Sequence, residues 1–135
     1  MFRQGNGRQM AEKIKGVSAD LVIPLPLHPD RLRERGFNQA LELSRPVAKT
    51  LRLPIDITRC RRIRHTHPQA DLPVQKRTKN VRGAFQCSMD FSGMRIILVD
   101  DVMTSGSSLN ECARVLKRHG AAEVILLVAA RTQNK

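Results

Sequence analysis

The stretch RIILVDDVMTSGSSL, residues 95–109, places two adjacent acids between an apolar run and a loop rich in hydroxyl groups. Its four consecutive apolar residues, 96–99, follow Gly93 and precede a polar segment, which predicts a parallel strand covered on both faces. A carboxylate is costly to bury unless it finds a partner. Asp100 and Asp101 therefore indicate a use outside the strand itself.

The rest of the chain alternates between strand-like and helix-like segments, which predicts an α/β fold with an open, mainly parallel sheet flanked by helices. Prolines indicate where some of these segments end. Pro24 and Pro26 mark the end of the first strand, and Pro46 predicts either a kink or an early stop in a helix. Gly120 stands where the helix after residue 107 is expected to end. The expected strands are 20–27, 53–63 (edge-like because of its arginines), a minor one in 83–87, 95–101 and 123–130; the expected helices are 9–15, one from 37 or 38 through 51, 73–80 and 107–119, and residues 28–37 are expected to form a loop.

Length and composition limit the class of protein. The 135 residues are enough for one domain, 1–135, in which residues 1–19 are expected to form an amino-terminal helix and lead-in. Apolar residues make up 41% and charged residues 27%, and no apolar run is long enough to cross a membrane. The polar and basic first residues lack the apolar centre of a secretory signal, so a cytoplasmic location is expected.

The net charge of +12 predicts a polyanionic partner or a solubility role. Only 3% of the residues are aromatic, with no Trp and no Tyr, which disfavours base stacking and leaves phosphate contacts open. The positive charge is concentrated in residues 59–82, which contain eight basic residues and one acid, Asp71. Within it, residues 64–82 are interpreted either as a solvated basic face or as a flexible basic loop over an anion.

The cysteines and histidines carry weaker signals. Cys60, Cys87 and Cys112 form no CxxC pair, so buried thiols are favoured over a zinc ribbon or a disulfide framework. His65 and His67 have no third ligand nearby in the sequence, which favours loop histidines over a metal site.

A strand that ends in two acids and runs into a hydroxyl-rich turn is typical of a phosphosugar site. In an open parallel sheet, ligands lie beyond the carboxyl ends of the strands, where the next helix offers backbone N–H groups and its positive dipole end. Carboxylates repel phosphate but accept hydrogen bonds from sugar hydroxyls or help to hold Mg²⁺. The sequence therefore predicts a ribose 5-phosphate site, with the acids on the sugar and a phosphate loop made of Thr104, Ser105, Gly106, Ser107 and Ser108.

Two other interpretations of this stretch are less favoured. No GxxxxGK[ST] or GxGxxG motif accompanies a strand, which disfavours nucleotide loops of those kinds. A helix cap needs one polar side chain, whereas this stretch has two acids and four hydroxyls.

The same stretch resembles the motif by which type I phosphoribosyltransferases bind phosphoribosyl pyrophosphate (PRPP). Two further segments, VIPLPLHPDRLRERGFNQALELSRPVA and RHTHPQADLPVQKRTKNVRGAF, resemble the ComF/GntX subfamily of competence-associated proteins. The resemblance covers about residues 20–131. It implies the type I phosphoribosyltransferase fold, PRPP as ligand and Mg²⁺ as cofactor.

The resemblance also implies roles for individual residues. Asp100 and Asp101 would contact the ribose hydroxyls, with Mg²⁺ arriving with PRPP near these acids and not in a protein cage of its own. Residues 25–39 would form the pyrophosphate loop and residues 64–82 the flexible loop that closes over the site. The polar contacts would be Arg35, Asn38 and Gln39 in the first loop and Arg64, Thr66, Gln69, Arg77 and Asn80 in the second.

Many members of the subfamily carry an amino-terminal cysteine-rich zinc element that this sequence lacks, so the chain is interpreted as a short member or a fragment. Three functional hypotheses follow. The first is a Mg²⁺-dependent phosphoribosyltransferase of unknown acceptor linked to DNA uptake. The second is a module that senses PRPP or a nucleotide without turnover and binds DNA or a DNA-uptake helicase. The third is a plain nucleic-acid binder. The acceptor and the oligomeric state are left open.

Overall fold

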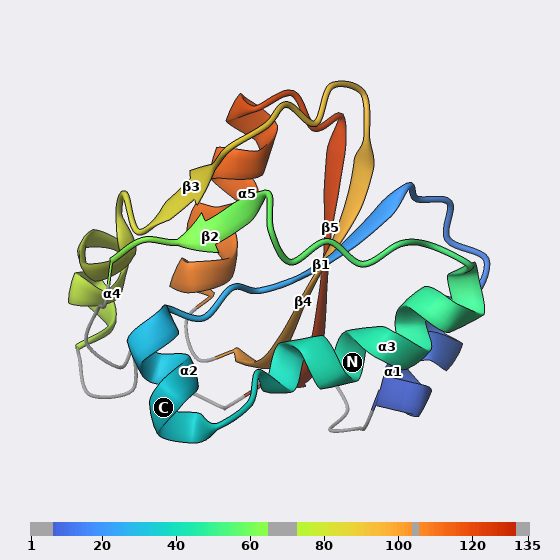
Figure 1. Ribbon diagram of the computed structural model, residues 1–135, viewed down its shortest axis with the longest axis horizontal. Coiled ribbons are helices and arrows are strands. Elements are labelled where there is room, and N and C mark those ends of the chain that lie inside the picture. The colour runs from blue at the N-terminus through green and yellow to red at the C-terminus, as the bar shows by residue number, and fades with distance from the viewer. Residues whose placement is uncertain (1–6, 65–72, 104–105, 132–135) are drawn as a thin grey trace.

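The computed structural model describes residues 7–64, 73–103 and 106–131 (Figure 1). Helices and strands alternate along most of this chain, as predicted. The helices are α1 (Gly7–Ile14), α2 (Pro29–Arg35), α3 (Gln39–Leu51), α4 (Val74–Val81) and α5 (Ser107–Arg118), and the strands are β1 (Leu21–Pro24), β2 (Cys60–Arg62), β3 (Phe85–Cys87), β4 (Arg95–Met103) and β5 (Glu123–Arg131).

Three parallel strands in the order β1-β4-β5 form the central sheet. β4 is the middle strand, and its residues 96–99 are fully buried, because ladders flank it on both edges and helices cover both faces. β1 ends at Pro24, which pairs with Val99 just before the two acids. The open parallel α/β fold predicted from the sequence is confirmed.

Two hydrophobic clusters cover the two faces of this sheet. On one face, α1 and α3 pack against alternate residues of the strands, including Val22, Ile97 and Val99. On the other face, Ile96 and Leu98 pack against α5, with Cys60 and Phe85 from β2 and β3 in the same cluster. In Figure 1, α1 and α3 lie on one side of the sheet, and α5 with β2 and β3 on the other.

The strand predicted over residues 53–63 is wrong in its extent, because only residues 60–62 form a strand, β2, and it lies outside the central sheet. Ile55 forms a single parallel bridge with Val22, and β2 then pairs antiparallel with β3 in a separate two-stranded sheet. Asp56 interrupts the strand, because its Oδ1 accepts the backbone N–H groups of Thr58 at 2.8 Å and Arg59 at 3.0 Å. This Asx turn directs the chain out of the central sheet.

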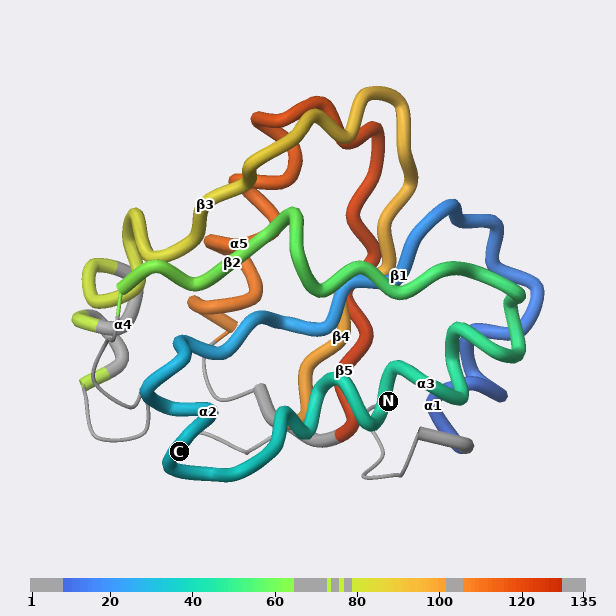
Figure 2. The backbone as a smooth tube through the Cα atoms, viewed as in Figure 1, coloured from blue at the N-terminus to red at the C-terminus, as the bar shows by residue number. Residues whose placement is uncertain are grey.

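The loop predicted over residues 28–37 contains a helix, α2, which follows β1 and precedes α3 along the tube in Figure 2. His28 caps it, since its Nδ1 accepts the N–H of Asp30 at 3.1 Å, and Pro29 occupies the first turn. Gly36 ends it in the left-handed region, at φ 80°, and donates its N–H to the carbonyl of Leu32. Proline in the first turn and glycine after the last turn are common in helices. The prediction of a loop overlooked these two signals.

Two other helices bear on the predictions. α3 begins after Asn38 and extends through Pro46 to Leu51, as expected, so that of the two alternatives given for Pro46, a kink or an early stop, the early stop is wrong. α5 ends before Gly120, as predicted. Gly120 has φ of 100°, and a Cβ there would lie 2.7 Å from the Asp90 carboxylate and 3.0 Å from the Ser92 backbone.

All three cysteines are free and buried, as expected. The Sγ atoms of Cys60 and Cys112 lie 3.7 Å apart. Over residues 7–64, 73–103 and 106–131, none of the helices has the length and apolar character needed to span a bilayer.

Candidate functional site

The two acids lie on β4 near the carboxyl edge of the sheet. Asp100 and Asp101 are both half-buried, and the backbone N–H of Asp101 donates to Oδ1 of Asp100 at 2.8 Å. Arg35 approaches from the end of α2, and its guanidinium lies 3.8 Å from Oδ2 of Asp101. β1 ends beside them at Pro24, so ends of two neighbouring strands and one helix meet at this edge.

The pKa of Asp100 is raised to about 8, first by burial and then by the hydrogen bond and like charge of Asp101. At pH 7, most molecules therefore carry a proton on this pair. A cation or several hydroxyl donors at the pair favour the ionised form, so a ligand of that kind releases the proton as it binds.

The amino terminus of α5 follows closely in the chain, because only residues 102–106 separate it from Asp101. Gly106 is the N-cap, with φ of 81°, and it has no side chain to cover the first backbone N–H groups of the helix. Ser107 is buried and Ser108 half-buried in the first turn. Thr104 and Ser105, the first two residues of the predicted phosphate loop, lie outside the described residues.

The predicted pyrophosphate-loop residues fall around α2 and α3. Arg35 reaches Asp101, as described above. Asn38 caps α3, since its Oδ1 accepts the N–H of Ala40 at 3.0 Å while its Nδ2 donates to the carbonyl of Leu25 at 3.5 Å. Gln39 is the first residue of α3 and is half-buried. The fold thus brings Arg35 to the acids and uses Asn38 to join the end of β1 to α3.

The basic segment, residues 64–82, is described only in part. Its carboxyl half forms the predicted short helix, α4, and Arg77 lies in that helix. Arg64 donates to the carbonyls of Asn80, at 2.9 Å, and Arg82. This contact brings the two ends of the segment together. Thr66 and Gln69, as well as His65 and His67, lie outside the described residues.

A buried carboxylate fixes the end of this segment to α5. Glu111, only 8% exposed, accepts the backbone N–H of Gly83 at 3.1 Å and forms an ion pair with Arg114 at 2.7 Å. The hydrogen bond from Arg114 is the largest cause that lowers the pKa of Glu111. The link joins the chain after α4 to α5, the helix that follows the acids in the sequence.

Arg62 is a candidate site residue that the sequence analysis did not select. It is half-buried on β2, with its guanidinium 5.2 Å from the ring centre of Phe85, its partner in the β2–β3 register. Burial lowers its pKa; the charge of Asp100 opposes this, and the like charge of Arg31 adds to it. Strand alternation was an available signal, because it puts Arg62 on the same face as the buried Cys60.

The donor set fits Mg²⁺ that arrives with a phosphorylated ligand. Carboxylate oxygens of the kind that Asp100 and Asp101 offer are ligands that Mg²⁺ prefers, usually together with waters and substrate phosphates. Among the residues that the structure describes, no group of three or more acids, histidines or cysteines is placed to hold a metal ion. Most of the coordination would therefore come from the ligand and water.

Residues 38–135 match the family model described as a phosphoribosyl transferase domain. Among curated proteins, competence protein F of Haemophilus influenzae is 36% identical over 115 residues, which are 83% of this chain and 50% of that protein. DNA utilization protein YhgH of Salmonella typhimurium is 36% identical over 124 residues, 91% of this chain and 55% of that protein. The chain thus spans about half the length of these relatives.

Solved structures show the same fold. A purine phosphoribosyltransferase from Pyrococcus horikoshii aligns over 93% of this chain and 80% of its own, with a TM-score of 0.58 and 16% identity. A structure described as the allosteric regulatory enzyme of purine biosynthesis aligns over 92% of this chain and 24% of its own, with a TM-score of 0.60 and 20% identity. At these identities the likeness shows the fold alone, that of the type I phosphoribosyltransferases.

Proposed function

Given that this chain belongs to the phosphoribosyl transferase domain family, in its competence and DNA utilization branch, we propose that it binds PRPP with Mg²⁺ and transfers the phosphoribosyl group to an acceptor still to be identified, in a process linked to DNA uptake. The observation that carries the proposal is the pair Asp100 and Asp101, which lies on the middle strand a few residues before the amino terminus of α5. Acids for the sugar and helix amides for a phosphate thus follow each other at one edge of the sheet.

In this proposal each group of residues has one task. Asp100 and Asp101 accept hydrogen bonds from the ribose hydroxyls, and Gly106, Ser107 and Ser108, with Thr104 and Ser105 before them, hold the 5-phosphate. Arg35 and the residues from Asn38 to Gln39 form the pyrophosphate side. The basic segment adds positive charge over the leaving group, through Arg64, Thr66, Gln69, Arg77 and Asn80.

The transfer needs no nucleophile from the protein. The bond from ribose C1 to the pyrophosphate oxygen breaks, its electron pair leaves with pyrophosphate, and a nitrogen of the acceptor bonds to C1 and gives up its proton to water. Bound Mg²⁺ would neutralise the phosphate charge. The cations of this chain stabilise the charge that develops on the leaving oxygen, an electrostatic contribution made in the transition state.

A second candidate function is a module that binds PRPP or a nucleotide without turnover and contacts DNA or a DNA-uptake helicase. The net charge of +12 favours this candidate, since clustered positive charge attracts polyanions. The relatives that carry competence and DNA utilization in their names agree with it.

Pyrophosphate release separates the two candidates. The protein is incubated with PRPP, Mg²⁺ and a panel of nitrogenous bases, beside a variant with Asp100→Asn and Asp101→Asn. Release that depends on one acceptor and is lost in the variant supports the transferase. Binding of PRPP with no release across the panel contradicts the transferase and supports the module.

A further inference from the structure

β5 is the outermost strand of the central sheet on one side. The order of the parallel strands is β1-β4-β5, so one edge of β5 pairs with β4, and no strand among the described residues pairs with its other edge. β5 runs over nine residues, Glu123–Arg131. It therefore presents a long row of backbone N–H and C=O groups of the kind to which another strand can bind.

The opposite edge of the sheet is covered. The backbone N–H of Val22, on β1, donates to the carbonyl of Pro54 at 3.0 Å, and the N–H of Asp56 donates to the carbonyl of Val22 at 3.0 Å. Residues 54–56 thus pair with β1 as a further strand would. The two edges therefore differ, because the chain's own backbone occupies one of them and the other is open within the part of the chain that the structure describes.

The side chains of β5 are apolar on both faces of the sheet. Five consecutive apolar residues are only half-buried or exposed, although two of them extend one hydrophobic cluster and two extend the other: Val124, Ile125, Leu126, Leu127 and Val128. A continuous apolar run of this kind is typical of a strand that is covered on both faces inside a sheet. β5 also contains no proline and no lysine, residues that commonly protect an open edge.

The sequence of β5 is self-complementary in an antiparallel pair. When two copies of EVILLVAAR pair symmetrically about Leu127, Glu123 of one copy lies opposite Arg131 of the other at both ends of the ladder. Larger apolar residues then lie opposite smaller ones: Val124 opposite Ala130, Ile125 opposite Ala129, and Leu126 opposite Val128. Opposite charges and aliphatic pairs directly across a ladder stabilise it. The neighbouring symmetric registers, centred on Leu126 or Val128, leave both charged residues without an opposite charge.

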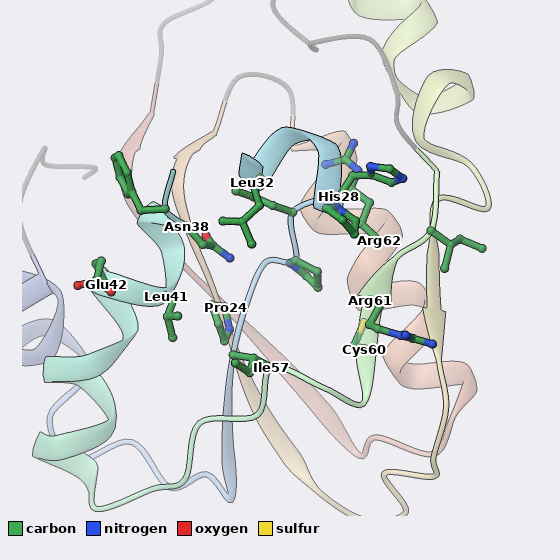
Figure 3. Close-up of a pocket in the computed structure, with 15 residues that line it drawn as sticks. Pro24, His28, Leu32, Asn38, Leu41, Glu42, Ile57, Cys60, Arg61 and Arg62 are labelled. Carbon is green, nitrogen blue, oxygen red and sulfur yellow. The ribbon is translucent and has the colours of Figure 1, made fainter. Parts of the chain in front are cut away.

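Most of the other exposed apolar side chains gather in a different place. Six large apolar side chains are exposed among the described residues, and four of them, including Leu32 and Ile57 in Figure 3, line a pocket of about 600 Å³ between α2, α3 and β2. Asn38 lines the same pocket, so this space belongs to the pyrophosphate side of the proposed PRPP site. No residue of β5 lines it. Leu126, which is 41% exposed, therefore belongs to a separate apolar surface.

We propose that β5 is the surface by which two copies of this chain associate, with antiparallel pairing about Leu127 that joins the two central sheets into one continuous sheet. Both copies contribute the same strand, so the arrangement closes at a dimer. The inference concerns residues other than those of the proposed transfer reaction, and it stands or falls separately from that proposal.

Sedimentation over a range of protein concentrations tests the proposal, at about 0.15 M salt so that charges more than about 8 Å apart are screened. We expect the native chain to form a dimer and no larger species, because the edge of β1 is already covered. A chain that stays monomeric at all concentrations would overturn the proposal, and so would a series of larger species.

Matched variants locate the interface. Leu126→Lys places a charge on β5, and it does so twice in a symmetric dimer, so we expect the dissociation constant of the dimer to rise at least about tenfold. Met89→Lys places the same charge at an exposed side chain outside β5 and is expected to leave the dimer unchanged. Equal weakening by the two variants would contradict the site. A dimer weakened by Ile57→Lys and not by Leu126→Lys would lie at the pocket and overturn the proposal.

Exchange of charges tests the register. Glu123→Arg and Arg131→Glu each set like charges opposite each other at both ends of the ladder, and we expect each variant alone to dimerise about tenfold more weakly than the native chain. An equal mixture of the two variants restores opposite charges at both ends, so mixed dimers should form with nearly native affinity. Thermal unfolding checks that each variant is folded. A mixture no stronger than its separate components would overturn the pairing about Leu127.

Discussion

The two sides of the candidate site differ in how their positions are fixed. The acid side, β4 and α5, consists of a nine-residue middle strand and a twelve-residue helix that lie directly against the core. The basic side, β2, β3 and α4, consists of two three-residue strands and one eight-residue helix. Cys60 and Phe85 pack in the same core cluster as α5, and two polar contacts add to this on the basic side: Arg64 to the carbonyls of Asn80 and Arg82, and Glu111 to Gly83.

This difference indicates which side of the site is held in place before a ligand binds and which side can adjust to the ligand. Long ladders and a buried strand hold groups in fixed positions, whereas short strands and exposed segments open at lower free energy. We therefore expect the acid side to set the position of sugar and phosphate in advance. The basic side is expected to adapt to a ligand after it has bound.

The largest expected effect is electrostatic and falls on the acid side. Ser108→Asp adds a negative charge in the first turn of α5, where it would repel a bound phosphate. We expect the affinity for PRPP to fall by at least about 100-fold, while the helix itself is stabilised by about 0.3 to 1 kcal/mol. Titration calorimetry measures the first effect and thermal unfolding the second.

Ala122→Asp is the control, because it adds the same charge at an exposed residue beyond the far end of α5. Its affinity for PRPP is expected to be close to native. A native-like affinity in Ser108→Asp would mean that the phosphate binds elsewhere.

The next effect compares the packing of the two sides. Gly120 and Gly83 both have positive φ, but an added Cβ meets Asp90 and Ser92 only at Gly120. We expect Gly120→Ala to lower the free energy of unfolding by about 2 to 3 kcal/mol and Gly83→Ala by about 1 kcal/mol, since only the first adds a steric clash to backbone strain. Urea denaturation measures both. A larger loss in Gly83→Ala would reverse the comparison.

A third prediction concerns pH. The pKa of Asp100 in the folded state is raised to about 8. Between about pH 4 and pH 8, the folded chain therefore keeps a proton on Asp100 that the unfolded chain has lost. The native protein therefore loses stability as the pH rises from about 4 to 8, and Asp100→Asn does not have this loss. We expect Asp100→Asn to unfold like the native protein at pH 4 and to be more stable by several kcal/mol at pH 8.

Denaturation at both pH values, with Asp101→Asn in parallel, checks this assignment. A variant Asp100→Asn that is less stable than the native protein at pH 8 would show that Asp100 is ionised and well stabilised in the folded state.

The smallest effect concerns the link between the two sides. Glu111→Gln replaces the carboxylate that accepts a hydrogen bond from the N–H of Gly83 with a neutral amide. We expect the free energy of unfolding to fall by about 1 kcal/mol. Because the pKa of Glu111 is lowered on folding, this loss should be present at pH 7 and disappear as the pH falls below the ordinary pKa of a glutamate. Hydrogen exchange should become faster at Gly83. Exchange that is unchanged there would remove Glu111 as the link.

The acid side could be predicted from the sequence, because its signals are local. Residues 96–99 form one apolar run, and the acids and the glycine follow within ten residues, so strand, turn and helix are encoded in one stretch. α2 could also have been predicted from Pro29 and Gly36.

The position of Arg62 could not be predicted in the same way. It depends on the pairing of β2 with β3, in the register that sets Arg62 opposite Phe85, across residues 63–84. The Asx turn at Asp56, which takes the chain out of the central sheet, competes with a strand pattern of apolar residues. Strand propensity alone does not decide between the turn and a continued strand, because tertiary contacts determine which of the two forms.

The central claim is that Asp100 and Asp101 form the sugar side of a PRPP site, and calorimetry with PRPP and Mg²⁺ tests it most directly. The native chain is compared with Asp100→Asn combined with Asp101→Asn, and with Glu12→Gln combined with Glu123→Gln, which makes the same two changes from carboxylate to amide at exposed positions. The account predicts that the aspartate pair variant binds at least about 100-fold more weakly and that the glutamate pair variant binds like the native chain. Native affinity in the aspartate pair variant would contradict it.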